Sequence, residues 1–128
     1  MPILKTTFSL ILLTLIGCST VQTSHKNKDW LGFSESGIAS YYADKHQHQK
    51  IASGERYRHT LKTAAHKTLP FGVSVKVTNL ENSKSVVVKV NDRGPFVKGR
   101  IIDLSKSAFK AISQPNDGLL NVRIEVVP

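Results

Sequence analysis

Two valine-rich segments in the middle of the chain show the clearest pattern of apolar and polar positions. In residues 73–78, valines alternate with polar residues, which is the two-residue period of a strand with one buried face. Residues 85–90 carry valine at almost every position, which is typical of a strand covered on both faces. Residues 79–84 supply a turn, so we predict that the two segments pair as a hairpin.

Shorter segments complete the predicted architecture. Residues 37–42, 63–66 and 101–104 are brief strand candidates. Residues 122–126 alternate apolar and polar side chains, as expected for a closing strand. Ser105 is predicted to cap a short helix with three apolar residues on one face, Ala108, Phe109 and Ile112. Roughly six short strands and one helix, without an internal repeat, predict a small all-β barrel.

The N-terminus has the composition of an export signal. Residues 8–16 form an apolar run that is too short to span a bilayer and fits the core of a secretory signal. Residues 15–18, Leu-Ile-Gly-Cys, resemble a bacterial lipobox, which implies that residues 1–17 are a signal peptide and that Cys18 carries lipid. In a Gram-negative cell, Ser19 after this cysteine implies sorting to the outer membrane, facing the periplasm. The alternative is that Cys18 is a chance residue in an uncleaved anchor.

The chain is expected to have one folded domain behind a tether. Residues 18–36 are predicted to be the lipidated N-terminus and a polar tether, and residues 37–127 the barrel domain. Trp30, Leu31 and Phe33 interrupt the tether, and we expect them to hold it against the domain rather than to stack on a ligand. We therefore expect a lipid-anchored protein of the cell envelope.

The chain is strongly basic. Its 18 Lys and Arg residues against 9 Asp and Glu residues give a formal net charge of +9, and loss of residues 1–17 removes only Lys5. Such a charge usually suggests nucleic acid or another anionic surface as a partner. Because the signal predicts export, we expect the cell wall and membrane headgroups as acidic partners, and no nucleic acid. The alternative is a solvated basic face that only aids solubility.

The common cofactor and nucleophile motifs are absent from the sequence. It has no nucleotide-binding loop, zinc-binding helix or nucleophilic serine elbow. His46 and His48 are two residues apart in a polar segment, but no cysteine or carboxylate is spaced to complete a metal site with them. We therefore expect neither a metal nor another cofactor.

Three titratable residues lie where a predicted strand meets a loop: Glu55, His66 and Asp92. Asp92 belongs to residues 91–96, Asn-Asp-Arg-Gly-Pro-Phe, directly after a valine-rich strand. A strand end fixes the origin of a side chain while the loop leaves it open to a substrate. If a barrel gathers these ends at one rim, the three residues face a common groove. From the residues alone, the commoner explanation of Asp92 is a turn former that bonds its own backbone.

Six short motifs follow one another along the predicted domain. They are Gly-x-Ala-Ser-Tyr-Tyr (37–42), Ala-Ser-Gly-Glu-x-Tyr (52–57), Thr-Ala-Ala-His-Lys-Thr-Leu-Pro-Phe-Gly (63–72), Val-Thr-Asn-Leu (77–80), Asn-Asp-Arg-Gly-Pro-Phe (91–96) and Arg-Ile-Ile-Asp-Leu-Ser (100–105). In this order they resemble the rare lipoprotein A family, which includes septal lytic transglycosylases. The resemblance implies a six-stranded double-psi β-barrel.

The resemblance also implies a reaction. Septal enzymes of this family cleave the glycan strands of peptidoglycan, favouring strands without stem peptides. A lytic transglycosylase uses no water: an acid protonates the bridging glycosidic oxygen, and the C6 hydroxyl of the same sugar attacks C1 to leave a 1,6-anhydro end. One carboxyl group can therefore act first as acid and then as base, unlike the two-carboxylate arrangement of most glycosidases.

The functional acidic and histidine positions of the family fall on Glu55, His66 and Asp92 in this chain. We assign the acid and base role to Asp92. Glu55 is expected to orient the substrate or stabilise the developing positive charge, and His66 to hold a carboxylate by a hydrogen bond. The alternatives are an exposed loop position for Glu55 and a satisfied barrel position for His66.

Four further residues are expected to contact the substrate: Ser53, Tyr41, Tyr42 and Arg93. Of the two tyrosines, one is predicted to lie in the core and the other to be available to stack on a sugar ring. Asp103 is expected to be structural and to pair with Arg100 or Arg93 across the turn.

Two departures from the family pattern concern function. Residues 47–51 read Gln-His-Gln-Lys-Ile where the family carries an aromatic residue, His, Gly and a basic residue ahead of Thr, so we expect altered substrate contacts near Glu55. The chain ends at Pro128 and is expected to lack the C-terminal peptidoglycan-binding repeat domain of longer members. A non-catalytic wall-binding or wall-loosening module and a structural envelope lipoprotein are the alternatives. A monomer is expected.

Overall fold

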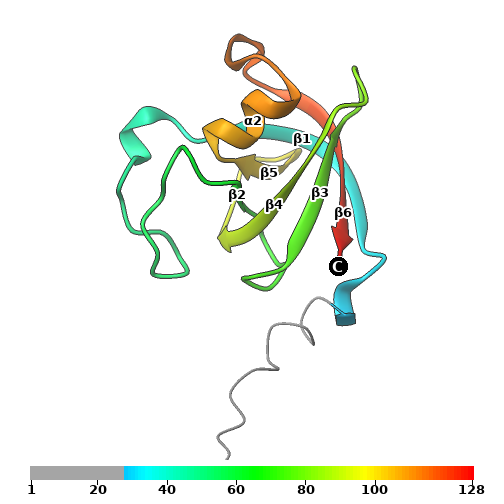
Figure 1. Cartoon of the computed structure of the whole chain (residues 1–128), viewed down its shortest axis with the longest axis horizontal. Coiled ribbons are helices and arrows are strands. Elements are labelled where there is room, and N and C mark those ends of the chain that lie inside the picture. Colours follow the sequence, from blue (N-terminus) through cyan, green and yellow to red (C-terminus); the bar gives the residue numbers. More distant parts are fainter. Residues whose placement is uncertain (1–27) are drawn as a thin grey trace, which may run out of the picture.

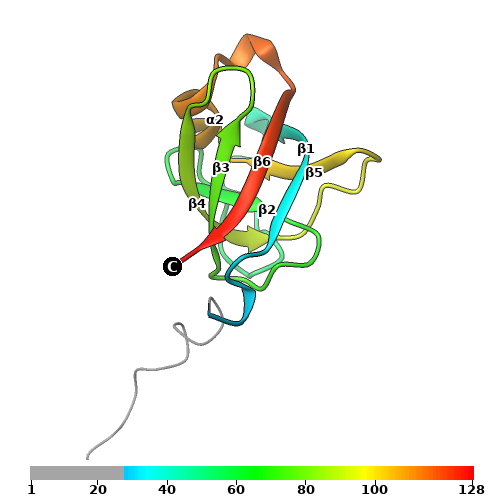
Figure 2. The same cartoon turned by 90° about the vertical axis from the view of Figure 1, so that its right-hand side faces the viewer.

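Six strands close into a β-barrel in the structure, a computed structural model that describes residues 28–128. The strands are β1 (Ser34–Tyr41), β2 (Thr63–Ala65), β3 (Ser74–Asn79), β4 (Ser85–Asp92), β5 (Arg100–Leu104) and β6 (Leu120–Val127). Their order around the barrel is β1-β5-β2-β4-β3-β6, which Figures 1 and 2 show from two sides. The predicted small all-β barrel is confirmed.

The described part begins with helical residues 28–30, and η1 (Asp44–His46), α2 (Lys106–Ile112) and η2 (Pro115–Asp117) lie between the strands. Helix α2 packs beside β4, β1 and β5 (Figure 1). The hydroxyl oxygen of Ser105 accepts a hydrogen bond from the backbone N–H of Ala108 at 3.3 Å, which caps the helix. The helix buries Ala108, Phe109 and Ile112, so the predicted cap and apolar face are both confirmed.

Two strand pairs are parallel and join segments that are far apart in the sequence. Strand β1 runs parallel to β5, with Ser40 opposite Asp103, and β2 runs parallel to β4. The other neighbouring strands are antiparallel, including β3 and β4, where Val77 lies opposite Val86. The predicted hairpin is therefore confirmed. Strands β5 and β2 lie between β1 and β4, and the Tyr42 hydroxyl, just after β1, reaches Asp92 at the end of β4.

Valine and isoleucine side chains fill the interior of the barrel. On β3 and β6 buried residues alternate with more exposed ones, as the sequence pattern predicts. On β4 the alternation is similar: Val88 and Val90 are buried, whereas Val87 is 52% exposed. The expectation that both faces of this strand are covered is wrong at Val87, because the outer face of a closed barrel is covered only where another element packs on it.

The first described residues pack against the barrel. Trp30 and Phe33 contact the core cluster and meet edge to face, with ring centroids 5.9 Å apart, while Leu31 is 45% exposed. Strand β1 begins at Ser34, three residues before the predicted start of the domain. The predicted signal peptide and Cys18 lie outside the described residues. Among the helices of the described part, none is long and apolar enough to cross a membrane.

Candidate active site

A cavity of about 510 Å³ opens between the end of β1, the end of β4, strand β5 and residues 49–52 of the loop before Glu55. These four parts of the chain are separate in the sequence, and the barrel brings their side chains together around the cavity. A second cavity of about 310 Å³ adjoins it and shares Tyr41 and Ala43. The polar residues lining the first cavity are Ser40, Tyr41, Tyr42, His46, Gln49, Lys50, Asp92, Arg93, Arg100 and Asp103.

Asp92 is the last residue of β4 and is held from two sides. Its Oδ1 accepts hydrogen bonds from the backbone N–H groups of Ala52 and Arg93, both at 2.9 Å. Its Oδ2 accepts a hydrogen bond from the Tyr42 hydroxyl at 2.5 Å. The bond to Arg93 is a local turn contact, but Ala52 and Tyr42 lie 40 and 50 residues away in the sequence. A turn-forming role therefore accounts for only part of this arrangement.

Tyr42 is the side chain that joins Asp92 to the barrel wall. Its ring stacks on Tyr57 with centroids 4.2 Å apart and meets His46 edge to face at 5.6 Å. Burial raises the pKa of the Tyr42 phenol far above its ordinary value, helped by the hydrogen bond to Asp92 and the negative charges of Asp92 and Asp103. The phenol therefore keeps its proton and remains a hydrogen-bond donor to Asp92.

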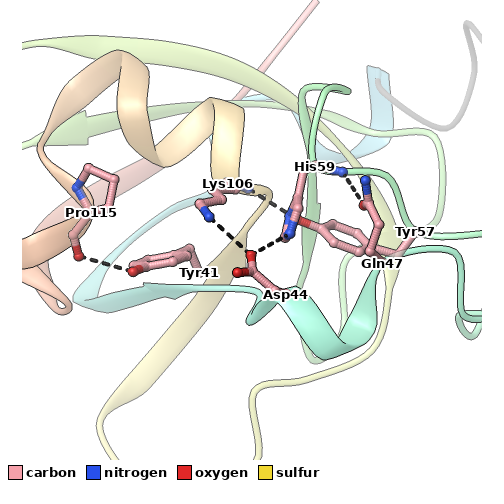
Figure 3. Close-up of polar contacts among 7 residues, drawn as sticks. All are labelled: Tyr41, Asp44, Gln47, Tyr57, His59, Lys106 and Pro115. Atoms are coloured by element: carbon pink, nitrogen blue, oxygen red, sulfur yellow. Dashed lines mark hydrogen bonds and ion pairs between the residues drawn. The ribbon is translucent and has the colours of Figure 1, made fainter.

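A polar network surrounds the hydroxyl of Tyr57 (Figure 3). The Tyr57 hydroxyl accepts from the backbone N–H of Lys106 at 3.1 Å and lies 2.6 Å from His59 Nδ1. His59 Nε2 lies 2.9 Å from Asp44 Oδ1, which also accepts from Lys106 Nζ at 3.0 Å. This pattern assigns the Tyr57 proton to the bond with Nδ1 and the imidazole proton to Nε2. The network holds Tyr57, which is 1% exposed, against Tyr42.

Tyr41 and Tyr42 face different surroundings although they are adjacent. The Tyr41 ring lies 4.6 Å from the ring of the buried Phe109, and its hydroxyl donates to the carbonyl oxygen of Pro115 at 3.0 Å (Figure 3). Both tyrosines are partly buried and both line the larger cavity. Tyr41 thus packs toward the core, and Tyr42 points to Asp92.

Asp103 is a second carboxylate in the lining of the cavity. It lies opposite Ser40 in the parallel β1–β5 pair, and the Ser40 hydroxyl donates a hydrogen bond to its Oδ1. Nη2 of Arg100 lies 3.7 Å from the same oxygen, so the predicted pairing with Arg100 is confirmed. The sequence motif at residues 100–105 points to this aspartate, but its position in the cavity follows from the strand pairing.

Arg93 lines the cavity but directs its charged group toward the β2–β3 connection. Its Nη1 donates to the backbone carbonyl oxygens of Leu69 at 2.9 Å and His66 at 3.3 Å. The guanidinium carbon also lies 4.1 Å from the centroid of the Phe71 ring. Arg93 therefore ties the loop after Asp92 to the loop after His66.

His66 is buried and lies outside the cavity lining. Its Nδ1 accepts from the backbone N–H groups of Thr68 at 3.1 Å and Leu69 at 3.0 Å. Burial lowers the pKa of His66 to about 4, and the positive charges of Arg93 and Lys67 lower it further. The ring is therefore neutral at pH 7. Its backbone N–H donates to the carbonyl oxygen of residue 92 at 3.1 Å, so His66 supports the cavity from behind.

Glu55 is exposed and is also outside the cavity lining. Its Oε2 accepts a hydrogen bond from Asn91 Nδ2 at 3.4 Å. Glu55 therefore contacts the residue before Asp92, at a point where the pairing of β4 with β2 shifts register. Ser53 holds this loop: its N–H donates to the Asn91 carbonyl at 3.3 Å, and its hydroxyl accepts from the Glu55 N–H at 3.4 Å.

The three acidic and histidine candidates therefore do not line one cavity. Asp92 lies in the lining, whereas Glu55 and His66 flank the end of β4 outside it. Sequence reasoning did not place Ser40, Arg100 or Asp103 in the cavity, because the parallel pairing of β1 and β5 cannot be inferred from local patterns. Within residues 28–128, no three His, Cys, Asp or Glu side chains are grouped so that they would hold a metal ion.

The loop at which the chain departs from its predicted family forms part of the cavity wall. Gln49, Lys50, Ile51 and Ala52 line the cavity. The loop is closed by backbone bonds, with the Ile51 N–H donating to the Glu55 carbonyl oxygen at 2.9 Å. Gln47, next to these residues, accepts from the His59 N–H at 2.8 Å (Figure 3). The substituted positions therefore shape both the cavity and the network behind it.

Comparison with known proteins identifies sequence relatives over most of the barrel. A double-psi β-barrel family model described as lytic transglycolase matches residues 34–124. The endolytic peptidoglycan transglycosylase RlpA of Pasteurella multocida is 50% identical over 101 residues, which cover 79% of this chain and 34% of the relative. RlpA of Vibrio cholerae is 55% identical over 96 residues, which cover 75% of this chain and 36% of the relative. The chain thus spans about a third of the length of these relatives.

Solved structures with low sequence identity share the fold. The Streptomyces papain inhibitor superposes with a TM-score of 0.62 and 24% identity, covering 77% of this chain and 97% of that one. The expansin of Clavibacter michiganensis superposes with a TM-score of 0.58 and 22% identity, covering 75% of this chain and 51% of that one. At these identities the likeness concerns the barrel alone. Together with the family match, it confirms the predicted double-psi β-barrel.

Proposed function

Because this chain belongs to the RlpA family of double-psi β-barrel lytic transglycosylases, we propose that it cleaves peptidoglycan glycan strands by endolytic transglycosylation. The observation that carries the proposal is the fixed position of Asp92 in an open cavity, where backbone and tyrosine donors from three segments orient its carboxyl group. Such orientation before the substrate arrives is what acid and base catalysis requires.

Asp92 has one acceptor position left for the reaction. A carboxylate offers about four lone-pair sites, two on each oxygen. The N–H groups of Ala52 and Arg93 occupy the two sites on Oδ1, and the Tyr42 hydroxyl occupies one on Oδ2. We assign the catalytic proton to the remaining site on Oδ2. Tyr42, which keeps its own proton, then fixes the direction of that site.

The reaction balances without water. The Asp92 proton passes to the bridging oxygen as the bond from C1 to that oxygen breaks, and the departing strand carries the new hydroxyl. The C6 hydroxyl oxygen of the same sugar then bonds to C1, and its proton returns to Asp92. The products are a shortened strand and a strand with a 1,6-anhydro end. Strands without stem peptides are the expected substrate because the family resemblance implies that preference.

The other predicted site residues take supporting roles in this proposal. Glu55 and Ser53 hold the loop whose Ala52 N–H binds Asp92. His66 and Arg93 hold the end of β4 through backbone carbonyls. These residues act through Asp92, so we describe them as positioning residues. Tyr41 and Tyr42 provide aromatic surface in the cavity for a sugar ring.

Digestion of purified sacculi and of glycan stripped of stem peptides tests the proposal. The purified full chain is expected to release products with 1,6-anhydro ends, which are lighter than hydrolysis products by one water and are identified by mass spectrometry. Asp92→Asn is expected to abolish the release and to retain binding. The control is Glu81→Gln, which removes an exposed carboxylate in the turn at the opposite end of β4. Binding by the wild type without anhydro products would instead indicate a wall-binding module.

We also propose that the chain is a lipoprotein that acts as a monomer at the envelope. The apolar run at residues 8–16 and the Leu-Ile-Gly-Cys sequence at 15–18 support a signal peptide and acylation of Cys18. In a Gram-negative cell the anchored domain would face the periplasm from the outer membrane. Labelled palmitate is expected to enter the wild type and not Cys18→Ala. A Cys18→Ala variant that still floats with membranes contradicts the anchor.

A further inference from the structure

We propose that Asp103 is a second catalytic carboxylate of this cavity and stabilises the positive charge that develops at C1 when the glycosidic bond breaks. The inference rests on the proposed transglycosylase function and assigns to Asp103 the electrostatic role that the sequence suggested for Glu55. It goes beyond the structural pairing with Arg100, which accounts for one of the two carboxylate oxygens.

The position of Asp103 is built into the barrel. It lies on β5 opposite Ser40 of β1, and both residues line the cavity that contains Asp92. The Ser40 hydroxyl donates to Oδ1, so the carboxylate is held in one orientation by a group from a different strand. A carboxylate fixed on two paired strands is a more rigid support for a developing charge than one on a loop.

The second oxygen of Asp103 is free to face a substrate. Among the described residues, no hydrogen bond reaches Oδ2, whereas every oxygen of Asp92 has a donor. Oδ2 lies 4.0 Å from the point that a Cβ atom on Gly94 would occupy, which places this oxygen beside the turn that follows Asp92. Gly94 has φ of +123°, a conformation that side-chain-bearing residues rarely adopt.

The charge of Asp103 is only partly balanced. Arg100 is 3.7 Å away and both side chains remain partly exposed, at 29% and 25%. The negative charges of Asp92 and Asp103 both contribute to the raised pKa of Tyr42, so both act on the same part of the cavity. Cleavage of a glycosidic bond gives C1 oxocarbenium character. A preorganised negative group beside C1 stabilises that transition state more than the neutral ground state.

Glu55 does not meet the same requirements. It is exposed, its carboxylate accepts from Asn91, and it is not part of the cavity lining. Charge in water is screened and worth little to a transition state inside the cavity. The structure therefore favours Asp103 over Glu55 as the second carboxylate.

Steady-state kinetics of the full chain on glycan without stem peptides test the assignment. Asp103→Asn keeps an acceptor for the Ser40 hydroxyl and removes the charge. It is expected to lower kcat about 100-fold with little change in KM or Tm. Arg100→Gln removes the ion pair and leaves the charge of Asp103. Its loss of kcat is expected to be at least tenfold smaller than the loss in Asp103→Asn. Glu81→Gln serves as the control for loss of a distant carboxylate.

The outcomes separate this inference from the proposed function. If the wild type releases no anhydro products, the proposed function fails. If the wild type is active and Asp103→Asn retains kcat within about twofold, or if Arg100→Gln loses as much as Asp103→Asn, the inference alone fails. Should Asp103→Asn not fold, Ser40→Ala decides: kcat must fall with KM and Tm maintained, and an unchanged kcat overturns the catalytic role.

Discussion

The two parts of strand β4 differ in what holds them in place. Residues 85–90 pair with β3 and bury Val88 and Val90 in the core. Of the last two residues, Asp92 accepts hydrogen bonds from Tyr42 and Ala52, and Asn91 donates one to Glu55. Apolar area supports the first part, and directed polar contacts between distant segments support the second. Substitutions of buried apolar residues should therefore change mainly the free energy of unfolding. Substitutions of the polar contacts around Asp92 should change mainly the reaction rate.

The largest effect on stability is expected from a residue of the apolar barrel core. Ile124 of β6 is fully buried opposite Val77, so Ile124→Ala should lower the free energy of unfolding by about 4 kcal/mol through lost burial and a cavity. Urea denaturation measures this change. The rate of anhydro-end formation per folded molecule should stay the same.

The matched control for Ile124→Ala is Val87→Ala, which truncates an exposed valine on the same barrel. It should change the free energy of unfolding by less than about 0.5 kcal/mol. A lower kcat for Ile124→Ala at unchanged stability would contradict the separation between the two regions.

His66, which lies behind the end of β4, is expected to reduce the free energy of unfolding by about 3 kcal/mol when the pH falls from 7 to 4. Its pKa is about 4 in the folded chain and 6.5 in the unfolded chain. Between these values the unfolded chain binds a proton that the folded chain excludes. The contribution is therefore fully present above pH 6.5 and is lost as pH falls toward 4.

Urea denaturation of the wild type and His66→Gln at pH 7 and pH 4 measures the His66 contribution. The variant should show a pH dependence that is smaller by about 3 kcal/mol, whatever its own stability at pH 7. Equal pH dependence in the two proteins would mean that His66 titrates alike in the folded and unfolded chains.

The smallest effect is expected from Tyr57, a buried residue that supports Tyr42 beside the end of β4. Its ring packs on Tyr42, and its hydroxyl contacts His59 and the Lys106 N–H. Tyr57→Phe should cost about 1 kcal/mol of stability, because buried polar partners lose their bond. It should also lower kcat a few-fold, because Tyr42 is less firmly held against Asp92.

Calorimetry and steady-state kinetics on the same Tyr57→Phe preparation test whether the Tyr57 hydroxyl affects both Tm and kcat. Unchanged kcat together with reduced Tm would make the network behind Tyr57 a purely structural feature. Unchanged values of both would remove any role of the hydroxyl.

Several features of the fold could be predicted because their signals are local. The alternation in residues 73–78 and 122–126 indicated strands, and Ser105 indicated the start of a helix. Motif order indicated the family, and the motif at residues 91–96 pointed to Asp92. These signals depend on side chains a few residues apart, so they are visible without knowledge of the tertiary structure.

The sequence by itself determined the barrel strands, the helix cap and the importance of residues 91–96. Only the tertiary structure decided which carboxylates share the cavity: Asp92 and Asp103 line it, while Glu55 and His66 lie outside. The physical reason is that strand periodicity is a property of neighbouring residues, whereas the contact of Ser40 with Asp103 spans 63 residues. That contact depends on the parallel pairing of β1 with β5, which no local pattern specifies.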